Sequence, residues 1–91
     1  MNQLDREILG FVEMVASNED CDDFKIEHIN EAEKRISIKF YHLNNLENGI
    51  YIRSTMSNTI HITDSFQADS WYAITKIVEA CMKVIFREVS E

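Results

Sequence analysis

The sequence predicts an α+β fold in the order α-β-β-β-β-α: a four-stranded antiparallel meander sheet with both helices packed on one face. Near both ends of the chain, apolar residues recur every three or four positions, as they do along one side of an amphipathic helix. In between, apolar and polar residues alternate with the period of half-exposed strands. Short polar connections separate these strands, which favours antiparallel neighbours and leaves the second sheet face open.

The 91-residue chain is expected to form a single domain, residues 1–91, because this length supports one hydrophobic core. A hydrophobic content of 45% and the absence of proline are typical of a globular protein. The N-terminus does not resemble a secretory signal, and no apolar run reaches the roughly 18 residues that span a bilayer. These features predict a soluble cytoplasmic protein without a membrane partner.

The first helix is expected at about residues 3–17, with Asp5 in its first turn complementing the helix dipole. Arg6, Gly10 and Glu13 fall on its polar side. The charged, aperiodic run at residues 18–23 is then a loop. The apolar stripe comprises Leu4, Ile8, Leu9, Phe11, Val12, Val15 and Ala16.

Four segments with a period of two follow, and their apolar positions are mostly isoleucine. The connection after the second strand contains Asn48 and Gly49, which suit positive backbone φ angles. The strands are expected at about residues 24–28, 36–43, 50–53 and 59–63, and the connections at 30–34, 44–49 and 55–58.

The last helix is expected at about residues 70–89, with Asp69 or Ser70 as its N-cap. Its apolar face is wider than the roughly 100° stripe that one sheet face requires. Part of that face must therefore meet the first helix or a second subunit. The residues that could serve either the core or a homodimer contact are Trp71, Ile77, Met82 and Phe86.

The negative charge of the chain is concentrated in one acidic segment, Glu13–Glu33, where eight carboxylates face the single cation Lys25. The chain carries a formal charge of −7, and this segment alone accounts for it, so the remainder is neutral. Such a field attracts basic partners and repels nucleic acid and anionic membranes. The eight residues are Glu13, Glu19, Asp20, Asp22, Asp23, Glu27, Glu31 and Glu33.

Two interpretations of this segment stay open. It lacks the glycine and the twelfth-position glutamate of a calcium-binding loop. If residues 19–23 were extended, they would place about one carboxylate every 3–5 Å, close to the roughly 3.4 Å spacing of phosphates along a DNA strand. The segment could therefore mimic nucleic acid. It could also be an ordinary solvated loop, which needs no functional explanation.

The open sheet face is expected to be mildly basic and aromatic, which suggests a second kind of site. Rings that stack on bases and cations that hold phosphates occur on sheets that bind single-stranded nucleic acid. Tyrosine and threonine are also common on any half-exposed sheet. The face collects Lys25, Glu27, Lys39, Tyr41, Tyr51, Arg53, Thr59, His61 and Thr63, of which Lys39, Tyr41, Tyr51, Arg53 and His61 are the candidate ligand residues.

No catalytic, cofactor or metal site is expected. The sequence has no nucleophile-elbow serine and no glycine-rich phosphate loop. His28, His42 and His61 follow the strand alternation, and the first two are expected to be core histidines. Cys21 and Cys81 do not form a disulfide framework and are assigned no chemistry.

The leading hypothesis from the sequence is a non-enzymatic protein-binding module that docks its acidic surface on a basic site of a partner. By analogy with small acidic proteins, it would inhibit or regulate a nucleic-acid enzyme, as immunity proteins, antitoxins or phage anti-defence proteins do. The alternative is nucleotide or single-stranded nucleic-acid binding on the open sheet face. A homodimer through the last helix or an edge strand is a further hypothesis.

Overall fold

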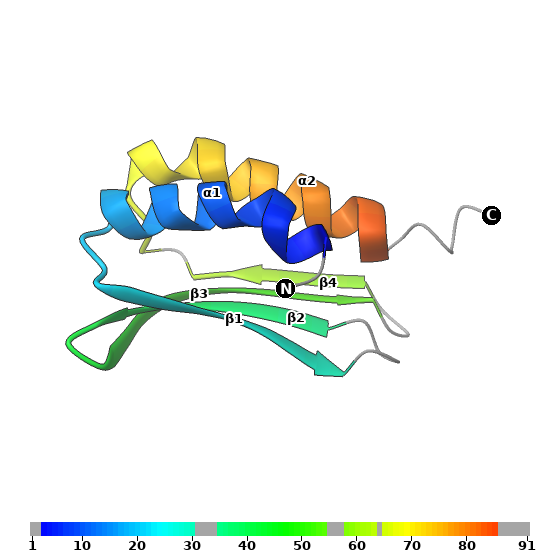
Figure 1. Ribbon diagram of the computed structural model, residues 1–91, viewed down its shortest axis with the longest axis horizontal. Coiled ribbons are helices and arrows are strands. Elements are labelled where there is room, and N and C mark those ends of the chain that lie inside the picture. The colour runs from blue at the N-terminus through cyan, green and yellow to red at the C-terminus, as the bar shows by residue number, and fades with distance from the viewer. Residues whose placement is uncertain (1–2, 31–34, 55–57, 64, 86–91) are drawn as a thin grey trace.

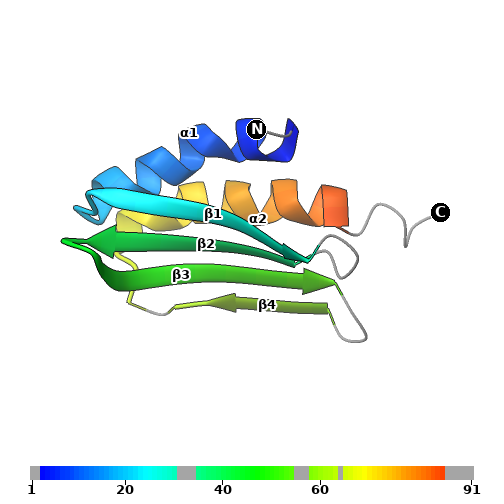
Figure 2. The same ribbon diagram turned by 60° about the horizontal axis from the view of Figure 1, so that its bottom comes forward.

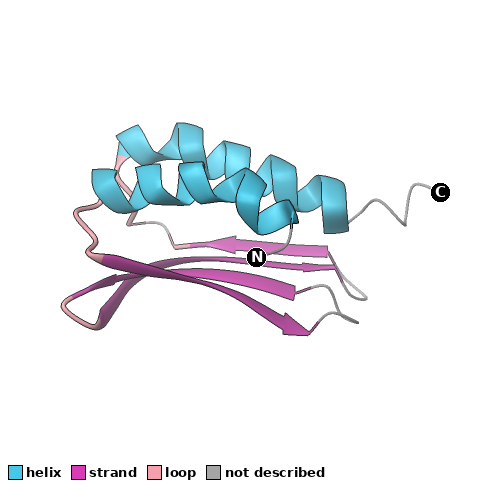
Figure 3. Cartoon of the chain, viewed as in Figure 1, coloured by secondary structure: helices cyan, strands magenta, loops and turns pink. Residues whose placement is uncertain are grey.

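The computed structural model describes residues 3–30, 35–54, 58–63 and 65–85, and it confirms the predicted architecture. Four antiparallel strands form one open sheet in the order β1-β2-β3-β4, and both helices lie on the same side of it (Figure 1). Figure 3 shows the two layers by element type. The elements are α1 (Gln3–Asn18), β1 (Asp23–Asn30), β2 (Arg35–His42), β3 (Asn45–Ser54), β4 (Asn58–Ile62), a 3₁₀ turn η1 (Ala68–Ser70) and α2 (Trp71–Ile85).

The predicted apolar stripe of α1 is the face that packs into the core. Leu9 and Phe11, which belong to this stripe, are only half-buried, whereas Arg6, Gly10 and Glu13 are exposed, as the pattern predicts. Because 3.6 residues complete a turn, residues three and four apart share one face and can be buried together. The buried residues are Leu4, Ile8, Val12, Val15 and Ala16.

The end of α1 is a Schellman-type cap in which Asp20 takes the position usually given to glycine. Asp20 has a φ of 56°, and its N–H donates to the Ser17 carbonyl at 3.2 Å. The N–H of Cys21 donates to the Ala16 carbonyl at 2.8 Å. These two bonds satisfy carbonyls that the helix leaves unpaired. The chain therefore turns sharply after α1 and enters β1 at Asp23.

The strand register aligns apolar residues in rows across the helix-facing side of the sheet. Ile26, Ile38, Ile50 and Ile62 are successive Cα partners across all four strands. Ile36 and Ile52 form the neighbouring row with Ile60. These rows and the two helices enclose one hydrophobic core among the described residues.

The connection between β2 and β3 differs from the prediction. It is a tight turn at Leu43 and Asn44, which have φ angles of 50° and 67°, and β3 begins at Asn45. Asn48 and Gly49 lie inside β3, where no glycine has a positive φ. A bulge at Glu47 separates the pairs Phe40–Asn48 and Tyr41–Leu46. The polar run at 44–49 concealed this pairing, because a bulge interrupts the alternation that marks a strand.

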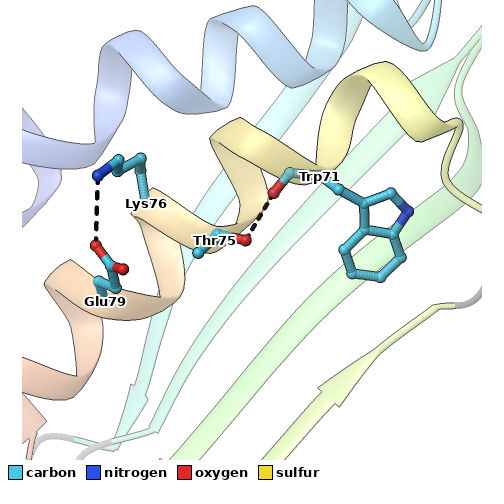
Figure 4. A network of polar contacts seen from close by, with 4 residues as sticks. All are labelled: Trp71, Thr75, Lys76 and Glu79. Carbon is cyan, nitrogen blue, oxygen red and sulfur yellow. Dashed lines mark hydrogen bonds and ion pairs between the residues drawn. The ribbon is translucent and has the colours of Figure 1, made fainter.

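The last helix begins one residue later than predicted, after η1. Its first turns carry a Thr75 hydroxyl that donates to the Trp71 carbonyl at 2.8 Å and a Lys76–Glu79 ion pair at 3.7 Å (Figure 4). The Trp71 indole points away from α1, on the side of the helix toward β4 (Figure 4). Its ring meets that of Phe66, which in turn meets Phe40, both with edge-to-face geometry.

Of the residues considered for core or dimer contact, the structure buries some and leaves others exposed. Ile77 is fully buried in the core, whereas Trp71 and Met82 remain 40% and 37% exposed. Phe86 lies outside the described residues, as do residues 31–34 and 55–57 of the turns expected at 30–34 and 55–58. The wide apolar face of α2 is thus only partly used within one chain.

Candidate functional site

Six carboxylates gather at one end of the molecule, which we call the acidic end. At this end α1 finishes, the β2–β3 hairpin turns and α2 begins (Figure 1). Glu19, Asp20, Asp22 and Asp23 come from the α1–β1 junction, as the sequence suggested. Glu47 from the bulge and Asp69 from η1 join them, although neither belongs to the acidic segment. Glu47 is brought to this end by the register of the β2–β3 hairpin, and Asp69 by the path of the chain from β4 to η1.

Glu19 fastens the α1–β1 junction to the start of α2. One of its carboxylate oxygens, Oε2, accepts the Gln67 N–H at 3.0 Å and the Ser70 hydroxyl at 2.5 Å. Both donors lie at the N-terminal end of the η1–α2 segment, where backbone N–H groups lack helical partners and the helix dipole favours a negative charge. Asn18 adds a bond from its side-chain amide to the Asp69 carbonyl at 3.3 Å.

Asp22 fastens the same junction to the β2–β3 turn. Its carboxylate oxygens accept the N–H of Leu43 at 3.2 and 3.3 Å. The N–H of Asp22 donates to the Tyr41 carbonyl at 3.1 Å. Residues 19–23 are therefore not the extended strand that the DNA-like spacing assumed, because the Schellman-type cap and these bonds fold the segment. The distances used for that comparison do not apply.

The acidic end lacks compensating charge. In the part of the chain that the structure describes, no lysine or arginine forms an ion pair with any of its six carboxylates. The thiol of Cys21 lies within the resulting negative field. Burial raises the pKa of its thiol, and Glu19, Glu47, Asp22 and Asp20 raise it further. Four of the six carboxylates thus act on one point of the surface.

The rest of the acidic segment does not reach this end. Glu13 is exposed on α1. Glu27 lies on the open sheet face, where it pairs with Lys39 at 3.6 Å. Strand β1 then carries the chain away from the acidic end over eight residues, or about 23 Å. Glu31 and Glu33 lie outside the described residues. A segment that is continuous in sequence is therefore divided in space.

The open face brings together some of the predicted ligand residues. Ser37, Tyr51 and His61 are successive Cα partners on β2, β3 and β4, and Lys39 pairs with Gly49 in the next row. Tyr41 lies four residues from Ser37 along β2, or about 13 Å away, so the two tyrosine rings are not neighbours. The backbone of Arg53 pairs with Arg35 and Thr59, and its side chain is outside the described set.

A hollow of about 350 Å³ lies around Gly49 on this face. Lys39, Tyr51 and His61 line it together with Leu46 and Thr63. The Thr63 hydroxyl accepts a hydrogen bond from the Gly49 N–H at 3.0 Å. The backbone N–H of Thr63 donates to the Gly49 carbonyl at 3.1 Å. Because Gly49 has no side chain, the position between Lys39 and Thr63 on this face holds no side-chain atoms. A volume of this size is at the lower end of the roughly 300–1,000 Å³ of small-molecule sites.

The histidines and cysteines form no reactive group in the described chain. His42 is exposed beside the hairpin turn, so its predicted place in the core is wrong. The end of the hairpin carries it past the apolar rows that the helices cover. The side chain of His28 is not described. Cys21 and Cys81 are free thiols, and no group of three or more His, Cys, Asp or Glu side chains among the described residues could hold a metal ion.

Neither described helix is long and apolar enough to cross a membrane. No protein-family model matches the chain, and neither a curated protein nor a solved structure is significantly similar to it. The fold and its surfaces therefore carry the functional argument alone.

Proposed function

We propose that the protein is a non-enzymatic interaction module whose acidic end docks on a basic surface of another protein. The observation that carries this proposal is the gathering of six carboxylates from separate segments without a described cation to neutralise them. A basic site of a nucleic-acid enzyme presents the complementary field. Occupying that site would inhibit or regulate the enzyme, in the manner of an immunity protein, an antitoxin or a phage anti-defence protein.

Rigidity of the cluster supports this role. Glu19 and Asp22 are fixed by bonds to η1 and to the hairpin turn, and Asp20 is fixed by the cap of α1. A preorganised surface loses less conformational entropy on binding than a flexible acidic tail does. Asp20, Asp23, Glu47 and Asp69 are all exposed, so their charges face the solvent through which a partner approaches.

Electrostatic steering provides the test. Complementary fields raise association rates by about 10- to 1,000-fold at low salt, and salt screens the effect. The acidic-end triple variant Asp20→Asn, Glu47→Gln and Asp69→Asn removes three charges and keeps Glu19 and Asp22, which hold the fold. The matched control Glu7→Gln, Glu13→Gln and Glu79→Gln removes the same charge from exposed helix positions.

The chain itself, immobilised, is the bait for a panel of purified basic nucleases and DNA-binding proteins, with association followed by surface plasmon resonance at several salt concentrations. The acidic-end triple should associate about tenfold more slowly with the bound partner and show a flatter salt dependence. The control triple should behave as the parent does. Equal slowing by the two triples would reject a docking role for the acidic end.

The hollow around Gly49 favours a second candidate function, in which the open face holds a nucleobase. Tyr51 and His61 are neighbouring rings on adjacent strands, which suits stacking on a planar base. Lys39 lies at the rim of the hollow, where its ammonium group also forms an ion pair with Glu27. Glu47, one of the six carboxylates of the acidic end, also lines this hollow, so the two candidate sites adjoin each other.

A further inference from the structure

The two edges of the sheet are protected to different degrees. Edge strands carry unpaired backbone groups, and proteins usually blunt them with charged side chains or cover. The β1 edge carries Asp23, Lys25 and Glu27. The β4 edge, Asn58–Ile62, has the sequence NTIHI and carries no aspartate, glutamate, lysine or arginine. The end of the sheet at β4 is therefore the one that is open to further strand pairing.

The helix layer also stops short of β4. Helix α1 packs over β1 and α2 over β3, and β4 is the strand farthest from α1 (Figure 2). Ile60 belongs to the helix-facing row with Ile52, yet it is 41% exposed. A core-facing isoleucine at this exposure marks the place where the cover is incomplete.

An apolar flank of α2 continues this uncovered strip. Trp71 points to the β4 side of the helix, and its ring contacts Phe66, which follows β4 in the chain (Figure 4). Met82 lies eleven residues further on, which is just over three full turns, so it shares this flank. Ile60, Trp71 and Met82 together form what we call the β4 flank.

We propose that the β4 flank binds a second copy of the chain, with the two β4 strands pairing antiparallel across a twofold axis perpendicular to the sheet. This arrangement continues the sheet from four strands to eight and places the β4 flanks of both copies against each other on the same side of it. Identical uncharged strands can pair without the repulsion that like charges facing one another would cause.

The position of the charge favours a second copy as the occupant. The chain carries a net charge of −7, which opposes self-association wherever the acidic ends meet. The acidic end lies beyond the Ile62 end of β4, next to Phe66 and η1 (Figure 1). In antiparallel pairing Ile62 of one copy lies beside Asn58 of the other. The two acidic ends then point in opposite directions and stay at the two extremes of the dimer.

The size of the β4 flank sets the expected affinity between the two copies. Helix α2 has 15 residues and is therefore about 22 Å long, and a helix layer on a sheet layer is about 20 Å high. A face of this size buries about 450 Å² per copy, below the roughly 800 Å² of a standard interface. The dimer should therefore be weak, with a dissociation constant of about 10–100 μM.

Sedimentation velocity on the full chain at about 5 and about 500 μM tests the proposal, because the first lies below and the second above this range. The expected result is mostly a 10.7 kDa monomer at the low concentration and mostly a dimer of twice that mass at the high one. Ile60→Lys and, separately, Met82→Lys should each keep the protein monomeric. Leu43→Lys makes the same exchange at a 69% exposed apolar residue of the hairpin turn and should leave the dimer intact.

Amide hydrogen exchange identifies the edge that pairs. The β4 amides should exchange about three- to sevenfold more slowly at the high concentration, because the fraction of free monomer falls by about this factor over the expected range of dissociation constants. Those of β1 should not change. A monomer at 500 μM would overturn the proposal. A dimer that survives both lysine variants, or one that protects β1 instead of β4, would overturn it as well.

Discussion

The carboxylate of Glu19 accepts a hydrogen bond from the hydroxyl of Ser70 at 2.5 Å, across 51 positions of the chain. The same oxygen accepts the Gln67 N–H, so one acidic side chain joins the end of α1 to the beginning of α2. Ser70 is fully buried, and losing its acceptor would leave a buried hydroxyl without this partner.

Glu19→Ala should therefore lower the free energy of unfolding by about 1–3 kcal/mol, the cost of an unsatisfied buried donor together with a lost charged acceptor. Urea denaturation followed by circular dichroism measures this change. Glu13→Ala, at an exposed carboxylate on the same helix, should stay within about 0.5 kcal/mol of the parent. If the two variants were equally stable, Glu19 would have no fastening role.

Leu43 holds a positive φ of 50° that suits glycine or asparagine better than leucine. Leu43→Gly should stabilise the fold by up to about 1 kcal/mol, because this exposed side chain contributes little burial. Leu46→Gly, at another exposed leucine, makes the same change inside β3, where it should destabilise by about 0.5–1 kcal/mol. Thermal unfolding of both variants provides the comparison. A loss of stability in Leu43→Gly would contradict the assigned strain.

Both thiols should react slowly while the chain is folded. Burial raises the pKa of Cys81 to about 12, and burial with nearby carboxylates raises that of Cys21. Since the thiolate is the reactive form, labelling by Ellman's reagent at pH 8 should be slower than in the denatured protein, most of all at Cys81. Single variants Cys21→Ser and Cys81→Ser separate the two sites. Rapid labelling of Cys81 in the native state would contradict its burial.

The same shift predicts a pH dependence of stability. The folded state holds the Cys81 proton more tightly than the unfolded state, whose thiol has the ordinary pKa of 9.0. The stabilisation is therefore complete below pH 9 and is lost as the pH rises from 9 toward about 12. Cys81→Ala should show a shallower decline over this window in denaturant midpoints. Parallel pH profiles for the parent and Cys81→Ala would contradict the assignment.

Gly49 provides a sharp test of the open-face hollow. An added Cβ would meet only the Ile38 carbonyl, at an ordinary 3.5 Å, and the backbone φ is not positive. Gly49→Val should therefore fold and fill the hollow. Gly10→Ala, with no atom within 4 Å of its Cβ, is the control. If a nucleobase binds there, shifts of Tyr51 and His61 resonances on titration with AMP or an oligothymidylate should disappear in Gly49→Val only.

The outcome of that titration also separates the sources of the base. Saturation by AMP indicates a free nucleotide, and a response confined to the oligothymidylate indicates a single strand. Identical shifts in Gly49→Val and the parent would place the binding elsewhere. The absence of any shift with either ligand would remove the second candidate function.

The fold could be predicted from the sequence because its signals are local. The three- and four-residue spacing of α1 and the alternation of isoleucines in the strands each report burial of one face. The start of β3 could not be predicted, because Glu47 adds a residue that breaks the alternation and Leu43 occupies a turn position that leucine rarely takes. Fold class thus follows from periodicity, whereas register depends on such exceptions.

The acidic end could be predicted only in part. Glu19, Asp20, Asp22 and Asp23 are neighbours in sequence, so their clustering is visible there. The arrival of Glu47 and Asp69 depends on the hairpin and on the path from β4 to α2, which no local pattern encodes. Conversely, Glu27 belongs to the acidic segment of the sequence, but in the fold it forms an ion pair with Lys39, which lies diagonally opposite on β2.

The Schellman-type cap at Asp20 has a consequence for how this protein could diverge. Asp20 lies between the two fastening residues Glu19 and Asp22, and Asp23 directly follows Asp22. The Asp23 carboxylate accepts the N–H of the next residue, Phe24, and among the described residues neither carboxylate bonds to another segment. Their charges can be replaced while both fasteners stay in place, and asparagine tolerates the φ of Asp20. Selection on partner choice could therefore act at these two positions independently of selection on folding.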